Sequence, residues 1–85
     1  MVEEYDGTQK LGDTVVRFTA EWCVPCRKYG PLFSRASEKS DENWLSVDVD
    51  AFPAVAQEYK VMSIPAVFDQ GERVKNYMDW TRERL

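Results

Sequence analysis

Residues 15–28, VVRFTAEWCVPCRK, hold the pattern that decides the fold of this 85-residue chain. Residues 15–20 are mostly β-branched or aromatic, which predicts a short strand. Residues 26–40 are rich in helix-forming residues and carry apolar side chains at spacings of three and four, which predicts a helix. Cys23 and Cys26 therefore stand where a strand ends and a helix begins.

The remainder of the chain alternates short strands and helices. The pattern predicts a short helix opened by a proline at residues 53–60, and strands at residues 44–49, 64–68 and 73–78. The order strand, helix, strand, helix, strand, strand is a βαβ unit leading into a hairpin, which indicates an α/β fold. We expect one domain over residues 1–85, and residues 2–5 could add an edge strand.

Composition excludes several kinds of site and partner. The chain has two cysteines and no histidine, so it lacks the four ligands of a structural zinc site and the imidazole of Ser-His-Asp or Cys-His catalysis. A net charge of −4 argues against nucleic acid and anionic membrane as partners. No stretch is long and apolar enough to span a bilayer, and Met1–Lys10 lacks the features of a signal peptide. We therefore expect a cytoplasmic monomer that holds no metal.

The two cysteines form a C-x-x-C motif with a specific chemistry. Cys23 precedes the predicted helix, where free backbone N–H groups and the helix dipole favour a thiolate, the form that attacks disulfides. Cys26 lies one turn further along. We therefore interpret Cys23 as the nucleophile and Cys26 as the resolving thiol, with Pro25 restraining the loop and Trp22 forming an apolar wall. The alternative is a chance motif or half of an intermolecular metal site; the position between strand and helix favours the redox interpretation.

Several segments resemble the thioredoxin family. Residues 20–27, AEWCVPCR, resemble the family's active-site segment A-E-W-C-G-P-C-K. The further matches, in chain order, are Pro31 for the helix-kinking proline, 47–50 (VDVD) for the third strand, 61–65 (VMSIP) for the cis-proline loop and Gly71-Glu72 for the hairpin turn. The chain is thus identified as a short, truncated member of about glutaredoxin size. The resemblance implies three layers, a central mixed sheet of about four strands and reduced terminal helices.

The resemblance also implies site residues. It implies that the Ile64–Pro65 peptide bond is cis and that both residues line a substrate groove beside Cys23. The groove residues assigned in this way are Trp22, Val24, Pro25, Ile64 and Pro65.

The chain departs from the family at three positions near the motif. Val24 replaces the usual glycine, Arg17 takes the place of a buried aspartate that is thought to assist the resolving thiol, and Ser46 replaces the lysine that pairs with that aspartate. One hypothesis is that Arg17 extends to solvent near an acidic residue, with its stem over the core. The other is an ordinary strand residue on an exposed face. If Arg17 lies near the cysteines, its charge would favour the thiolate and make it a modulator.

The function implied is a thiol–disulfide oxidoreductase that reduces protein disulfides as a reversible electron carrier. The resemblance implies a thioredoxin reductase as partner, electrons from NADPH without a bound cofactor, and ribonucleotide reductase as a client. Two alternatives remain: a redox-responsive binding module without turnover, and a glutaredoxin-like, glutathione-dependent reductase. Residues 76–79 (NYMD) lack the glycines of the glutathione site, and an iron–sulfur cluster shared by two chains is disfavoured by Pro25.

Overall fold

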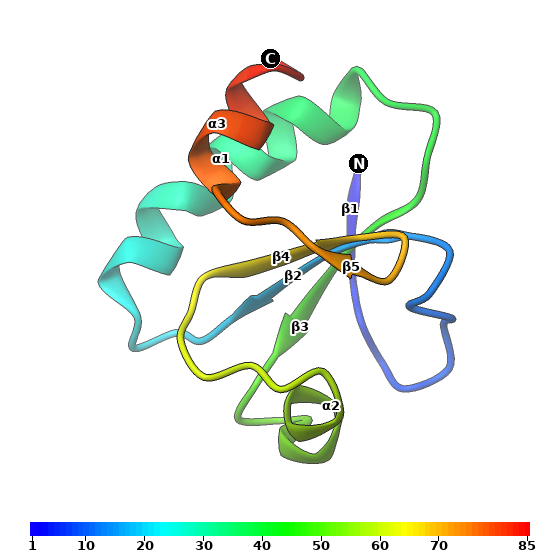
Figure 1. Ribbon diagram of the computed structural model, residues 1–85, viewed down its shortest axis with the longest axis vertical. Helices are drawn as coiled ribbons and strands as arrows, with labels where there is room; N and C mark the ends of the chain where they lie inside the picture. Colours follow the sequence, from blue (N-terminus) through cyan, green and yellow to red (C-terminus); the bar gives the residue numbers. More distant parts are fainter.

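A five-stranded mixed sheet runs through the middle of the computed structural model, which describes residues 1–85. The elements follow in the order β1 (Val2–Glu4), β2 (Val15–Thr19), α1 (Val24–Glu38), β3 (Trp44–Asp48), α2 (Pro53–Glu58), β4 (Ala66–Asp69), β5 (Glu72–Arg73) and α3 (Tyr77–Arg82). The strand order is β1-β3-β2-β4-β5: β1, β3 and β2 are parallel, β4 is antiparallel to β2, and β5 is antiparallel to β4. Helices α1 and α3 cover one face of the sheet and α2 covers the other (Figure 1).

The α/β fold with a central mixed sheet is confirmed, with one strand more than the four or so expected. The additional strand is β1, which forms within the predicted edge segment and pairs in parallel with β3, Val2 lying opposite Trp44. Backbone pairing continues past the strand, where the Tyr5 N–H donates to the Ser46 carbonyl at 2.9 Å. The edge of the sheet next to β3 is thereby covered.

The strand predicted over residues 73–78 is wrong for most of its length. Only Glu72–Arg73 pairs with β4, and the chain then turns into α3. The Asn76 side chain starts this helix by accepting a hydrogen bond from the Asp79 N–H at 3.1 Å, a standard helix N-cap. The helix then packs Tyr77 and neighbouring apolar residues on the sheet face that carries α1.

Each sheet face buries its own apolar cluster. The cluster on the α2 face centres on Leu11, Val16, Phe18, Leu45, Val47, Ala56, Ala66 and Phe68. The cluster on the α1 face centres on Val15, Tyr29, Phe33, Ala36, Trp44 and Val67. Strand β2 contributes to both clusters and lies in the centre of the sheet. The residues that follow β2, which include the C-x-x-C motif, are therefore attached to a central strand that is packed on both faces.

Candidate active site

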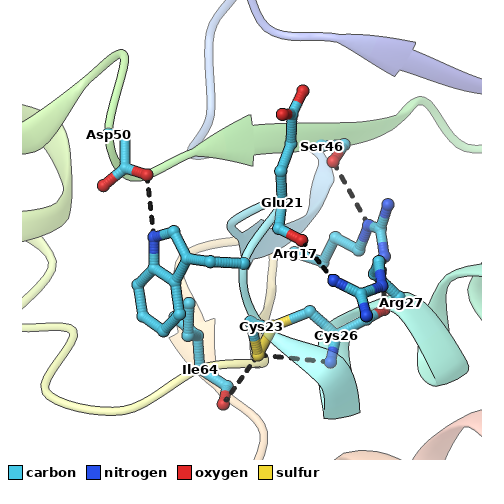
Figure 2. Close-up of a disulfide and its surroundings, with 9 residues drawn as sticks. Arg17, Glu21, Cys23, Cys26, Arg27, Ser46, Asp50 and Ile64 are labelled. Atoms are coloured by element: carbon cyan, nitrogen blue, oxygen red, sulfur yellow. Dashed lines mark hydrogen bonds between the residues drawn. A yellow bond between two sulfur atoms is a disulfide. The ribbon is translucent and has the colours of Figure 1, made fainter.

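Cys23 and Cys26 form a disulfide at the N-terminus of α1 (Figure 2). Cys23 is the helix N-cap, and its Sγ accepts a hydrogen bond from the Cys26 N–H at 3.2 Å. Pro25 lies in the first turn, where a missing N–H leaves no helical hydrogen bond unmade. The same N–H groups that lack helical partners are available to a sulfur anion at Cys23.

The two sulfurs differ in access. Cys26 is completely buried, whereas Cys23 keeps 5% of its surface exposed and lines a groove of about 560 Å³. An incoming disulfide can therefore reach Cys23 and not Cys26. The roles assigned from the sequence, in which Cys23 attacks and Cys26 resolves, stay a prediction that is taken up under the proposed function.

The loop before β4 faces the disulfide. The Ile64–Pro65 peptide bond is cis, as the resemblance implied, and the Ile64 carbonyl oxygen lies 3.7 Å from Cys23 Sγ. Ile64 lines the groove, whereas the half-buried Pro65 does not. The loop thus places a backbone acceptor, the Ile64 carbonyl, beside the Cys23 sulfur.

The groove has apolar walls on both sides of the disulfide. Its lining residues are Trp22, Val24 and Pro25 on one side, and Val49, Ala56, Val61, Met62, Ser63 and Ile64 on the other. The structure thus brings together four of the five groove residues assigned from the sequence, all but Pro65. Sequence analysis did not assign Met62 to the groove, and the structure shows that its side chain is 93% exposed. The feature that could have indicated it is an apolar residue two positions before Ile64.

Trp22 is held by a residue that the sequence did not single out. Its Nε1 donates to Asp50 Oδ2 at 2.9 Å, and the indole remains 65% exposed (Figure 2). Asp48 ends β3, and its Oδ1 accepts a hydrogen bond from the Asp50 N–H at 2.8 Å in the turn that follows the strand. Asp50 additionally orients the wall of the groove.

Arg17 lies beneath α1, not on an exposed strand face. The side chain is half-buried; Nε donates to Ser46 Oγ at 3.2 Å, and Nη1 donates to the Cys26 carbonyl oxygen at 3.3 Å (Figure 2). No carboxylate forms an ion pair with it. Burial lowers the pKa of the Arg17 guanidinium, and the negative charge of Glu4 opposes that effect. The residue that sequence comparison placed near the resolving thiol thus contacts the backbone of that cysteine directly.

Neither a metal site nor a membrane-spanning helix is present in the structure. No three acidic, cysteine or histidine side chains gather closely enough to hold a metal ion. None of the helices has both the length and the apolar character needed to cross a bilayer.

Comparison with known proteins agrees with this geometry. The family model described as Thioredoxin matches residues 3–85. The chain belongs to the thioredoxin family. A thioredoxin of Mycoplasma pneumoniae is 35% identical over 82 residues, covering 85% of this chain and 80% of the relative. Reduced Schistosoma mansoni thioredoxin pre-protein superposes with a TM-score of 0.66 at 32% identity, covering 85% of this chain and 78% of that one.

Other thioredoxin relatives are considerably longer than the matched region. A Mycoplasmoides gallisepticum thioredoxin is 44% identical over 54 residues, which cover 62% of this chain and 54% of the relative. Arabidopsis thaliana thioredoxin H5 is 40% identical over 65 residues, which cover 75% of this chain and 53% of the relative. The chain thus spans about half the length of several curated thioredoxins that it matches.

Proposed function

We propose that this thioredoxin-family chain is a thiol–disulfide oxidoreductase that reduces protein disulfides through Cys23 and Cys26. The observation that carries the proposal is the asymmetry of the pair: the two sulfurs are bonded across the first turn of α1, and only Cys23 opens to the groove. A reversible dithiol needs one sulfur that a client can reach and a second that the client cannot block.

The reaction proceeds in two exchanges. The Cys23 thiolate attacks one sulfur of the client disulfide; a Cys23–client bond forms, and the other client sulfur leaves as a thiolate that takes up a proton. The Cys26 thiol then loses its proton and attacks Cys23 Sγ. The Cys23–Cys26 bond forms, the second client sulfur leaves, and the client has gained two electrons that the dithiol has lost. The buried position of Cys26, one helical turn away, makes this second attack intramolecular.

The groove supports an extended protein segment as the client. Its walls are largely apolar, and Trp22, Val24 and Met62 are three of the four exposed large hydrophobic residues of the whole chain. The Ile64 carbonyl beside Cys23 offers a backbone acceptor to a client strand, in the manner of strand addition. We assign Pro65 an indirect part, since it follows Ile64 in the loop but does not itself line the groove.

Family membership supports the electron source and the partners. The proposed donor is a thioredoxin reductase that draws on NADPH, with no cofactor bound to this chain, and ribonucleotide reductase is a proposed client. We also propose the cytoplasm as its location, because a reducing compartment returns the pair to the dithiol state between turnovers.

An insulin-reduction assay with dithiothreitol tests the function. Wild-type protein should accelerate insulin precipitation, and Cys23→Ser and Cys26→Ser should both abolish turnover. The two variants form a matched pair: Cys26→Ser should accumulate a mixed disulfide with the client, visible by mass spectrometry, whereas Cys23→Ser should accumulate none. A wild-type protein that gives no acceleration, or a Cys23→Ser variant that traps the client, would refute the proposal. Client binding that survives in Cys23→Ser without wild-type turnover would instead indicate a binding module.

A further inference from the structure

The Arg17 guanidinium occupies the inner face of α1. Besides its hydrogen bond to the Cys26 carbonyl, it lies 5.7 Å from the centre of the Phe33 ring and directly under Gly30. A Cβ atom placed on Gly30 would lie 2.9 Å from Arg17 Nη1. Positions 26, 30 and 33 share one face of a helix. The Arg17 guanidinium therefore lies beneath the first two turns of α1, in the space left by the missing side chain of Gly30.

The charge of Arg17 has no close counter-charge. The ion pairs of the chain join Arg82 to Asp79 and Arg84 to Glu83, both far from it in sequence. Glu4 on β1 is the acidic residue in the same row of the sheet, but Ser46 on β3 stands between the two. The neighbouring residues of β3 and β4 in this row, Ser46 and Val67, do not titrate.

Two further groups on α1 face this cation, Tyr29 and Cys26. Burial raises the pKa of Tyr29, which keeps the phenol neutral at the pH values where thiols titrate. A guanidinium stays protonated over the same range. Among the residues that contact Arg17, Cys26 is therefore the one whose side chain changes its charge during turnover.

We propose that Arg17 is an electrostatic positioning residue that stabilises the Cys26 thiolate in the resolving exchange. This inference rests on the proposed function, since it concerns the second of its two steps. When the client is bonded to Cys23, the Cys26 thiol must release its proton to solvent before it attacks Cys23 Sγ and expels the client sulfur. Because the half-buried Arg17 lies against the backbone of Cys26, its charge favours the anion that performs this attack.

The resolving step can be isolated with one equivalent of dithiobis(nitrobenzoic acid). Cys23 attacks the reagent and releases one thionitrobenzoate; Cys26 then attacks the Cys23 mixed disulfide and releases a second. The chain has two cysteines, so each absorbance phase belongs to one sulfur. Stopped-flow traces from pH 5 to 11 give the midpoint of each phase for wild type, Arg17→Met, Arg17→Gln and Arg17→Lys.

Loss of the charge should raise the midpoint of the second phase by about 1 pH unit in Arg17→Met and Arg17→Gln. The reason is that an adjacent cation lowers the pKa of an acidic group by about that much or more. A thiolate of higher pKa is also more nucleophilic, which offsets part of the loss and leaves the rate at pH 7 about threefold lower. Above both midpoints the neutral variants should be faster than wild type by about the same factor. Crossing profiles of this kind do not arise from a misplaced Cys26, which slows the step at every pH.

Arg17→Lys should keep most of the wild-type midpoint, since it keeps the charge. Arg27→Met is the matched control: it removes the same charge from the residue after Cys26, but on the solvent side of the helix, and should move the midpoint by less than a third as much. An unchanged second midpoint in both neutral variants, parallel profiles, or an equal shift in Arg27→Met would overturn the inference. Absence of a second release from wild type would refute the proposed function instead.

Discussion

The two faces of the sheet are built differently, although they share the same strands. On the α2 face, consecutive inward positions of β2 and β3 are apolar: Val16 and Phe18 lie beside Leu45 and Val47. On the α1 face the same strands begin with the apolar pair Val15 and Trp44 and continue with the polar pair Arg17 and Ser46, which lie opposite each other.

This difference coincides with the position of the dithiol. The apolar part of the α1 face lies under the middle and end of α1, and the polar part lies under its first turns, where Cys26 is carried. The α2 face buries apolar side chains at these positions, whereas the α1 face gives up part of its apolar contact and places a charge under the reactive helix. We expect stability to depend most on the first face and redox chemistry on the second.

The largest stability effect should come from the α2 face. Phe18 is fully buried and packs against the rings of Tyr59 and Phe68. Phe18→Ala should lower the free energy of unfolding by about 3–5 kcal/mol, through lost burial and the cavity left behind. Urea unfolding followed by circular dichroism measures this loss. Met62→Ala, which removes an exposed side chain, is the control and should change stability by less than about 0.5 kcal/mol. If Phe18→Ala lowered the free energy of unfolding by no more than Met62→Ala does, the idea that stability depends most on the α2 face would be contradicted.

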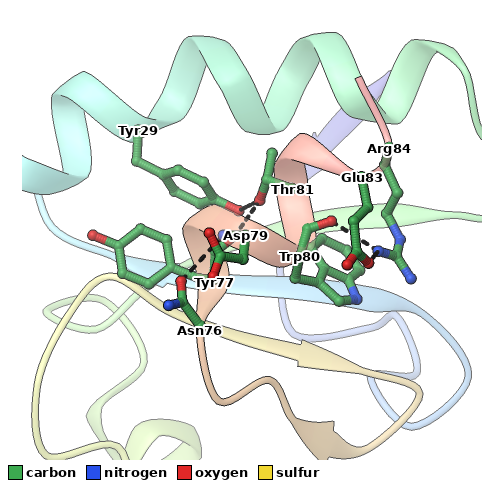
Figure 3. Close-up of polar contacts among 8 residues, drawn as sticks. All are labelled: Tyr29, Asn76, Tyr77, Asp79, Trp80, Thr81, Glu83 and Arg84. Atoms are coloured by element: carbon green, nitrogen blue, oxygen red, sulfur yellow. Dashed lines mark hydrogen bonds and ion pairs between the residues drawn. The ribbon is translucent and has the colours of Figure 1, made fainter.

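A smaller effect is expected where α3 packs on α1. The Tyr29 hydroxyl donates to Thr81 Oγ1 at 2.5 Å, and Thr81 in turn donates to the Tyr77 carbonyl at 2.6 Å (Figure 3). Thr81→Val leaves the buried Tyr29 hydroxyl without a partner and should cost about 1–3 kcal/mol of unfolding free energy.

The double variant separates this unpartnered group from general packing. Adding Tyr29→Phe to Thr81→Val removes the orphaned hydroxyl, so the pair should be more stable than Thr81→Val alone. Urea unfolding of the two single variants and the double variant completes the cycle. Strictly additive losses would show that the hydrogen bond between α1 and α3 is not the source of the effect.

The smallest effect should be found at Gly30, where the charge meets the helix. Replacing a helical glycine with alanine normally stabilises by about 1 kcal/mol. In the wild type the new Cβ would displace the Arg17 guanidinium, so much of that gain should be lost. In the Arg17→Met background, with a shorter and adaptable side chain, Gly30→Ala should give the full gain. Equal effects of Gly30→Ala in both backgrounds, measured by urea unfolding, would show that Arg17 is not seated against Gly30.

Much of the fold was accessible from local patterns. The alternation of strands and helices, the helix beginning at the C-x-x-C motif and the cis bond before Pro65 followed from residues close in sequence or from motifs matched to a family. The strand predicted over residues 73–78 failed because its apolar residues satisfy either pattern. The Asn76 cap and the packing of Tyr77 and Met78 against the apolar cluster on the α1 face favour a helix.

The sequence by itself determined the chemistry: two sulfurs three residues apart at a helix start, with a proline-bearing loop later in the chain. Tertiary structure alone decided what surrounds them. Trp22 meets Asp50 across 28 residues, Arg17 meets Ser46 across 29, and Tyr29 meets Thr81 across 52. The physical reason is that a C-x-x-C turn is built from local backbone geometry, whereas the side on which a long polar side chain comes to rest depends on the packing of elements far apart in the chain.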